Sequence, residues 1–402
     1  VSAFSLMLFP RFLSFTNHVK DIPTTAFFVA GIFSFYWFVE KDKKLGLFLS
    51  AIFLGIATSL KMNSAFGFII ILVWYLWKNY KKISYDKKTK TLQLPFPLSF
   101  FAYPFIAVLS YIAVQPYLWT SNVIEFKRRI WSTLHYWAGN RVNRLVYFDK
   151  VYAAHSTPWH YPIVSLLVTT PLIILILFIT GLVSAIKKRS SSDKLLILWF
   201  SISVLKFSLP GIPAYGVVQL FTEAIPALAI FAGIGANYFW NVLKKESHKI
   251  VFFIVLILGF LLILFSIVSI HPLEITYFNE LPLDMQKNFG VDYFLGATKL
   301  GVDWVNENVE EDATVIVPIG GEIASMYIRD DINFDKTPDN FGQYSFTDQI
   351  LNDKEEYVMY GVKEEFLKTA SEDTIVGYLE KNGEPIHVIY SQGYPVVKIY
   401  KT

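Results

Sequence analysis

The sequence predicts a polytopic α-helical membrane protein with a small soluble α/β domain at its C-terminal end. Three observations support this fold class. Apolar residues make up 53% of the 402 residues, too many for a soluble chain of this size. Before residue 272 there are eight apolar segments, and every second connection between them is rich in lysine. Residues 1–271 contain 26 Lys and Arg against 9 Asp and Glu, whereas residues 272–402 contain 10 against 24. We therefore expect two domains in two different solvents.

Each apolar segment is a candidate membrane-spanning helix. A bilayer crossing needs about 20 apolar residues, and the shorter segments can extend into their flanks. The eight segments are 24–40, 45–60, 65–77, 96–117, 161–185, 195–210, 217–240 and 250–271.

The lysine-rich connections follow the first, third, fifth and seventh segments, so they share one side, which the positive-inside rule makes cytoplasmic. The loop 118–160 and the tail 272–402 then face outward, as expected for a multi-pass protein of the plasma membrane. Anionic lipid accounts for the basic charge, so we expect the bilayer as a partner and no nucleic acid. The apolar run that starts at Val1 would be the outer end of a preceding helix, and we expect further residues upstream.

Within the outer loop 118–160, the stretch 122–148 places apolar residues at helical spacing against basic ones. We expect it to form a helix that lies in the outer membrane interface. In the tail, we expect helices near 292–308, 321–328 and 363–380. Buried or alternating apolar runs predict the strands, which are TVIV at 314–317, EYVMYG at 356–361, HVIYS at 387–391 and VVKIY at 396–400.

Polar groups just outside the hydrocarbon are the candidates for chemistry on lipid-linked substrates. Asp21 stands where the first predicted span begins, where it could act as a base or bind a substrate hydroxyl. It could equally cap the helix that follows. Lys61 ends the second span, where it could bind a phosphate or extend to the membrane surface. Arg128 and Arg129 could clamp a phosphate or anchor the loop on lipid headgroups.

Glu223 and Gln219 lie in the apolar run that begins the seventh span. An ionisable residue there is costly and is a functional candidate, although Glu223 could simply reach water. His135, His155 and His160 are too scattered to form a local metal signature. The sequence has no cysteine, which excludes disulfides and thiolate metal sites. We expect no required cofactor, and a divalent metal has no support from the sequence.

Several stretches resemble the polytopic glycosyltransferases of the protein O-mannosyltransferase and aminoarabinose-transferase kind, which take sugars from polyprenyl-phosphate donors. The stretches are HVKDIP at 18–23, PWHYPIVSLLVTTP at 158–171, YGVVQLFTEAIPALAIFAGIG at 215–235, HPLEITYFNEL at 271–281 and DYFLGATKLGVDWVNEN at 292–308. The resemblance covers most of the chain and implies a GT-C-like helical bundle followed by an outer α/β domain.

The resemblance implies transfer of a hexose-type sugar from a polyprenyl-phosphate donor to an acceptor outside the membrane (protein, lipid or glycan), with inversion at the anomeric carbon. It implies Asp21 as a catalytic carboxylate that deprotonates the acceptor. The resemblance extends to Lys20, Lys61 and His160. From their positions in the chain together with the resemblance, we expect contacts to the donor phosphate from Lys20, Lys61, Arg128 and Arg129, and contacts to the substrate from His18, His160, Tyr161, Gln219 and Glu223.

Two departures from the family's pattern stand out. The family's main catalytic carboxylate lies in a first outer loop that would precede Val1. In addition, Gly216 and Gln219 stand where relatives carry an acid and an arginine, and Glu223 stands where a proline is usual. The alternative function is a transporter or flippase for a lipid-linked or small substrate, a class that usually shows two similar halves with broken helices.

Overall fold

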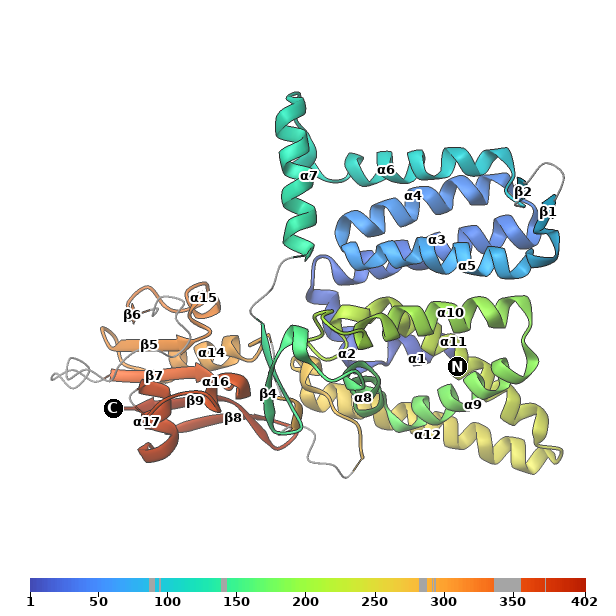
Figure 1. The fold of residues 1–402 in the computed structure, drawn as a ribbon. Coiled ribbons are helices and arrows are strands. Elements are labelled where there is room, and N and C mark those ends of the chain that lie inside the picture. The colour runs from blue at the N-terminus through green and yellow to red at the C-terminus, as the bar shows by residue number, and fades with distance from the viewer. Residues whose placement is uncertain are drawn as a thin grey trace. The chain divides into compact units, whose positions relative to one another are not determined.

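The computed structural model describes residues 1–86, 91–93, 95–138, 143–281, 288–290, 292, 294–335, 356–372 and 374–402. The chain forms two compact units (Figure 1). Unit 1 contains Val1–Arg141, Pro158–Ala214 and Val218–Leu264, and unit 2 contains Val142–Thr157, Tyr215–Val217 and Phe265–Thr402. Unit 2 thus holds the predicted tail domain together with two short segments from earlier in the chain.

Unit 1 is helical, and its helices follow the apolar segments of the sequence. They are α1 Ser2–Met7, α2 Pro10–Ser14, α3 Asp21–Lys41, α4 Lys44–Leu60, α5 Phe66–Lys78, α6 Ala102–Ala113, α7 Val123–Ala138, α8 Tyr161–Thr169, α9 Leu172–Lys188, α10 Ser191–Leu205, α11 Ile225–Val242 and α12 Glu246–Ile270, whose last residues belong to unit 2. A short antiparallel hairpin, β1 Ser84–Asp86 with β2 Thr91–Gln93, lies between α5 and α6.

Three stretches of helix are long and apolar enough to cross a membrane among the described residues, namely Asp21–Lys41, Gln219–Val242 and Glu246–Ile270. The prediction of about eight full spans is therefore not met. The helices α4, α5 and α6 are apolar but shorter. The predicted span 161–185 is broken into α8 and α9 at Pro171, because proline cannot donate the helical hydrogen bond.

The first helices of unit 1 pack in a layer in which α4 lies against both α3 and α6 (Figure 1). An aromatic cluster fills the core between α3, α5 and the 3-10 helix η4 Leu98–Phe101, which precedes α6. Phe35 lies 6.3 Å from Trp74, 6.1 Å from Tyr75 and 6.0 Å from Phe100, measured between ring centroids. Such edge-to-face contacts stabilise the core beyond the area that they bury.

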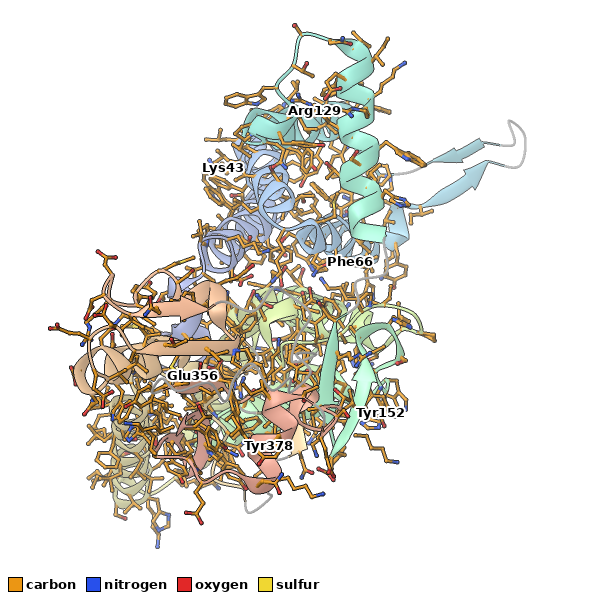
Figure 2. All side chains as sticks on the ribbon, turned by 90° about the vertical axis from the view of Figure 1, so that its left-hand side faces the viewer. Lys43, Phe66, Arg129, Tyr152, Glu356 and Tyr378 are labelled. Carbon is orange, nitrogen blue, oxygen red and sulfur yellow. The ribbon has the colours of Figure 1, made fainter. Side chains whose placement is uncertain are left out.

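The helix α7 confirms that the first part of the stretch 122–148 is helical. It runs across the direction of α3 to α6 rather than along it (Figure 1). Its exposed apolar side chains include Ile124, Trp131 and Leu134, whereas Arg129, which Figure 2 labels on the same helix, pairs with Glu125. The helix ends earlier than predicted, and part of the remaining stretch belongs to unit 2 as a hairpin of β3 Arg144–Tyr147 with β4 Lys150–Ala153.

Unit 2 is built on a five-stranded mixed sheet in the order β6-β5-β7-β9-β8. The strands are β5 Thr314–Ile319, β6 Asn333–Asp335, β7 Glu356–Gly361, β8 His387–Ser391 and β9 Tyr394–Lys401, and the helices are α14 Thr298–Asn308, α15 Gly321–Ala324, α16 Glu364–Leu367 and α17 Ile375–Asn382. All four predicted strands are confirmed, and β6 was not predicted. The predicted helix 363–380 is wrong as a single element, because two short helices stand in its place.

Unit 2 also contains a buried acid that predicts how its stability depends on pH. Burial raises the pKa of Glu365, and the attraction of Lys363, whose Nζ lies 3.6 Å from Oε1, opposes that shift. The folded state then holds the proton more tightly than the unfolded state, whose glutamate has a pKa near ~4.3. The contribution of Glu365 to stability is therefore greatest below that value, and it is lost as the pH rises through the raised folded pKa.

We expect Glu365→Gln to remove this pH dependence and to stabilise unit 2 at neutral pH. Hydrogen exchange of the β7 and β9 amides, corrected for the intrinsic rate at each pH, measures the effect. The control is Glu372→Gln, which changes an exposed acid paired with Lys381. Equal loss of protection with rising pH in Glu365→Gln and in the unchanged protein would contradict the expectation.

Candidate functional site

The carboxylate of Asp21 lies at the start of α3 and is completely buried. Lys61 donates to its Oδ1 at 2.9 Å, Gln219 Nε2 donates to its Oδ2 at 3.2 Å, and His18 Nδ1 lies 3.2 Å from Oδ2. The residue that caps α3 is Lys20, and no side chain makes the cap hydrogen bond. The cap interpretation of Asp21 is therefore wrong, because its carboxylate binds side chains from three other places in the chain.

Lys61 reaches Asp21 because the chain leaves α4 in an extended conformation at this residue, with φ −152° and ψ 112°. Its side chain turns into the bundle instead of extending to the membrane surface, and only 3% of the residue is exposed. Nζ also donates to the backbone oxygen of Gln219 at 2.6 Å. Lys61 therefore joins the end of α4 to the segment before α11.

That segment is an irregular 3-10 helix, η8 Gln219–Ala224, in which Phe221 departs from helical geometry. The regular helix α11 starts only at Ile225, with a proline in its first turn. Both Gln219 and Glu223 are buried, with 8% and 1% of their surfaces exposed. The expectation that Glu223 could reach water is thus wrong.

Glu223 is the centre of a second buried polar group. Its Oε1 accepts a hydrogen bond from Ser64 Oγ at 3.2 Å, and its backbone oxygen accepts one from Trp199 Nε1 at 2.7 Å. Its Oε2 is buried without a hydrogen-bond partner among the described residues. Lys206 interacts electrostatically with Glu223 and donates from Nζ to the backbone oxygen of Asn63 at 3.0 Å.

Lys206 was missed by sequence reasoning, although a signal was present. It is a single lysine in the apolar run LLILWFSISVLKFSL, and it is 7% exposed. The rule that marks an ionisable residue in an apolar span as a functional candidate selects Glu223 and applies equally to Lys206.

Together the two groups place two carboxylates and two lysines at one end of the helices of unit 1. They come from the start of α3, the turn between α4 and α5, the end of α10 and the segment before α11. Each ion would cost several kcal/mol to bury alone, so the opposite charges compensate one another. The amino-terminal end of α3 adds a favourable dipole for the negative charge of Asp21.

Other predicted residues lie elsewhere. The side chain of Lys20 is exposed. Arg128 and Arg129 sit on α7 and bind Glu125 at 2.7 and 2.9 Å. These hydrogen bonds from the two guanidinium groups lower the pKa of Glu125 to about 2. The prediction that both arginines clamp a phosphate is therefore not supported by their contacts, which are made within α7 and to the preceding turn.

His160 and Tyr161 stand at the start of α8. The ring of His160 packs edge-on against Trp159, with centroids 5.5 Å apart, and Tyr161 is 1% exposed. In the part of the chain that the structure describes, no three His, Asp or Glu side chains converge as a metal site would require.

No protein-family model matches the sequence, and a search of curated proteins finds no match. The geometry and charges of the site therefore carry the argument about function.

Proposed function

We propose that the protein is a membrane glycosyltransferase that moves a sugar from a polyprenyl-phosphate donor to a hydroxyl of an acceptor outside the membrane. The observation that carries this proposal is the buried Asp21 carboxylate, held by Lys61 beside a second buried lysine, Lys206. One buried group can accept a proton while neighbouring cations stabilise a departing phosphate, as this transfer requires.

In the proposed reaction, the acceptor oxygen attacks the anomeric carbon of the donor sugar as its proton passes to Asp21. The bond between the anomeric carbon and the phosphate oxygen breaks, and the configuration inverts. An ionised carboxylate has about four acceptor positions, of which three are used in the resting state. His18, whose side chain is 28% exposed, is the ligand that an incoming acceptor can displace. When it returns to Asp21 after transfer, it can pass the proton to solvent.

The leaving group is polyprenyl phosphate, which gains one negative charge as the bond to the sugar breaks. Lysine offers three N–H donors. Lys61 uses two of them on Asp21 and the Gln219 backbone, and Lys206 uses one on the Asn63 backbone. Both lysines are attached to the same turn, residues 61–65, so their remaining donors can stabilise one phosphate. We assign Lys206 to this role in place of Arg128 and Arg129.

The proposal requires the site to face away from the cytoplasm, and therefore the eight-segment topology of a GT-C-like bundle in which α4 to α6, α8, α9 and α10 also cross or enter the bilayer. A cysteine-free chain allows a direct test. Lys43 and Tyr390 are both exposed. We expect a membrane-impermeant maleimide to label Tyr390→Cys in intact cells, and to label Lys43→Cys only after the membrane is permeabilised. The reverse pattern would overturn the orientation.

Transfer itself is measured on the protein expressed from its complete gene and held in lipid nanodiscs. Radiolabelled polyprenyl-phosphate hexose and a cell-envelope extract are supplied, and both labelled acceptor and free polyprenyl phosphate are followed. We expect Asp21→Asn to reduce transfer at least about a hundredfold. The matched control is Asp193→Asn, which changes another buried first-turn carboxylate, in the capping box of α10. Unchanged transfer in Asp21→Asn would remove the proposed base.

A transporter is the second candidate, because two buried acid and lysine groups near helix ends also suit ion-coupled transport. The same experiment separates the candidates. For transport, the protein is reconstituted in closed vesicles. Labelled donor that crosses the vesicle membrane chemically unchanged, with no release of polyprenyl phosphate, would favour transport.

A further inference from the structure

A cavity of about 480 Å³ lies within unit 1, apart from the buried charges. Its walls come from four elements, namely residues 58–60 of α4, the last turn of α6 with the residues that follow it, the 3-10 helix η5 Pro116–Leu118, and the middle of α7. This volume is within the range of about 300–1,000 Å³ that small-molecule sites occupy.

The lining consists mostly of polar residues and carries no charge, and its surface is part polar and part apolar. It consists of Leu60 and seven residues with a hydroxyl or amide group, which are Thr58, Ser59, Tyr111, Gln115, Tyr117, Ser132 and Thr133. Hydroxyl and amide groups match the alternating donors and acceptors of a sugar, and tyrosine adds an aromatic face for its apolar C–H surface. An anion or a cation would find no opposite charge in this lining. The lining therefore fits a neutral polyhydroxyl ligand.

Part of the lining is already oriented by the protein. Ser59 Oγ donates to Gln115 Oε1 at 2.9 Å, which fixes the amide group and directs its Nε2 elsewhere. The guanidinium of Arg129 lies 5.4 Å from the ring centroid of Tyr117 and donates to that residue's backbone oxygen at 2.7 Å. Side chains held in place in this way lose little freedom on binding, which favours affinity.

Other polar groups remain available for a ligand. Within the described residues, Gln115 Nε2 and the hydroxyls of Tyr111, Tyr117 and Ser132 make no hydrogen bond to the protein. The cavity also adjoins the candidate site along the chain, since Leu60 in its wall is followed directly by Lys61.

We propose that this cavity binds a neutral hexopyranosyl unit, with Gln115 and Tyr117 as its principal contacts. The assignment of that sugar to the donor or the acceptor rests on the proposed function, whereas the binding itself does not. Two sources share this chemistry, the sugar of the lipid-linked donor and a sugar of a glycan acceptor.

Saturation-transfer NMR with methyl α-D-mannopyranoside and methyl β-D-glucopyranoside tests the binding. The protein is held in nanodiscs, because maltoside detergents would compete for the same cavity. Tyr117→Phe removes only a hydroxyl without a protein partner, so it should fold normally, and Gln115→Ala removes the amide. We expect each lost hydrogen bond to weaken binding between about twofold and tenfold. Tyr80→Phe, an exposed tyrosine outside the cavity, should leave binding unchanged.

The kinetic constants of the transfer reaction then identify the source. A KM increase for the lipid-linked donor in Gln115→Ala assigns the cavity to the donor sugar, and an increase for the acceptor assigns it to the acceptor. Binding that persists in Asp21→Asn and falls in Tyr117→Phe supports the cavity even if no transfer is found. Absence of saturation transfer from both glycosides, or binding that neither variant changes, overturns the proposal while leaving the transferase proposal intact.

Discussion

Replacing Lys61 by methionine is expected to destabilise the protein by about 3–5 kcal/mol, the usual cost of removing one partner from a buried ion pair. Lys61 and Asp21 are 3% and 0% exposed, and their charged atoms lie 2.9 Å apart. Without the lysine, the carboxylate is left in a site from which water is excluded. Unfolding followed by tryptophan fluorescence in nanodiscs measures the loss.

The matched control is Lys78→Met. Lys78 pairs with Glu40 at 2.6 Å in the same helical unit, but the two side chains are 29% and 24% exposed. Solvent screens such a pair, and its loss should cost less than about 1 kcal/mol. Equal destabilisation by the two variants would show that the burial of the Asp21 and Lys61 pair has no energetic consequence.

The double variant Asp21→Asn with Lys61→Met separates stability from function. Both charges are gone, so much of the lost stability should return, since a neutral pair of similar volume is often tolerated. Transfer should remain absent, because the proposed base is absent. A stable double variant that still transfers sugar would make the pair purely structural.

The sequence predicted most elements of the fold, because hydrophobic length and charge are local properties. The helix α4, Lys44–Leu60, lies within one residue of the predicted segment 45–60. The breaks were harder to predict. The stretch Gln219–Val242 is long and apolar enough to cross a membrane, as predicted for the segment 217–240, but its first residues form the irregular η8 before the helix α11 begins beside Pro226. Pro226, in the first turn of α11, is the local signal that marks this start.

The candidate site shows the same limit. Asp21, Lys61, Gln219 and Glu223 were selected one by one, as polar residues beside apolar runs. Their assembly depends on contacts between positions 40 and 198 residues apart, and no single-sequence pattern encodes these. The sequence alone gives a reason to doubt that Arg128 binds the donor phosphate, because Glu125 stands three residues earlier on the same helix face.

The close crossing of α9 and α11 should be the most sensitive packing contact to enlargement. A Cβ atom on Gly235 would lie 2.0 Å from the backbone oxygen of Leu177, and one on Gly181 would lie 1.8 Å from the backbone oxygen of Phe231. Small residues allow helix backbones to approach in this way, which favours packing in membranes. Neither clash can be relieved by rotating a side chain, so the two helices must separate.

We expect Gly235→Leu to destabilise unit 1 by about 3 kcal/mol or more, at or above the upper end of the usual cost of overpacking. The control is Gly259→Ala on α12, where the new Cβ would meet the Ile173 side chain at 3.0 Å. That side chain can move, and alanine gains about 1 kcal/mol of helix propensity over glycine, so we expect little net change. Tryptophan fluorescence during thermal unfolding in nanodiscs compares the two.

We expect Gly235→Leu to disturb the candidate site as well as the packing of α11. The helix α11 continues directly from η8, which supplies Gln219 to Asp21 and Glu223 to the second buried group. When α11 is displaced, these hydrogen bonds lengthen and the two lysines lose their fixed positions. Gly235→Leu should therefore reduce sugar transfer even below its unfolding temperature, whereas Gly259→Ala should retain it. A Gly235→Leu protein with unchanged stability and unchanged transfer would show that the helices can separate without disturbing η8.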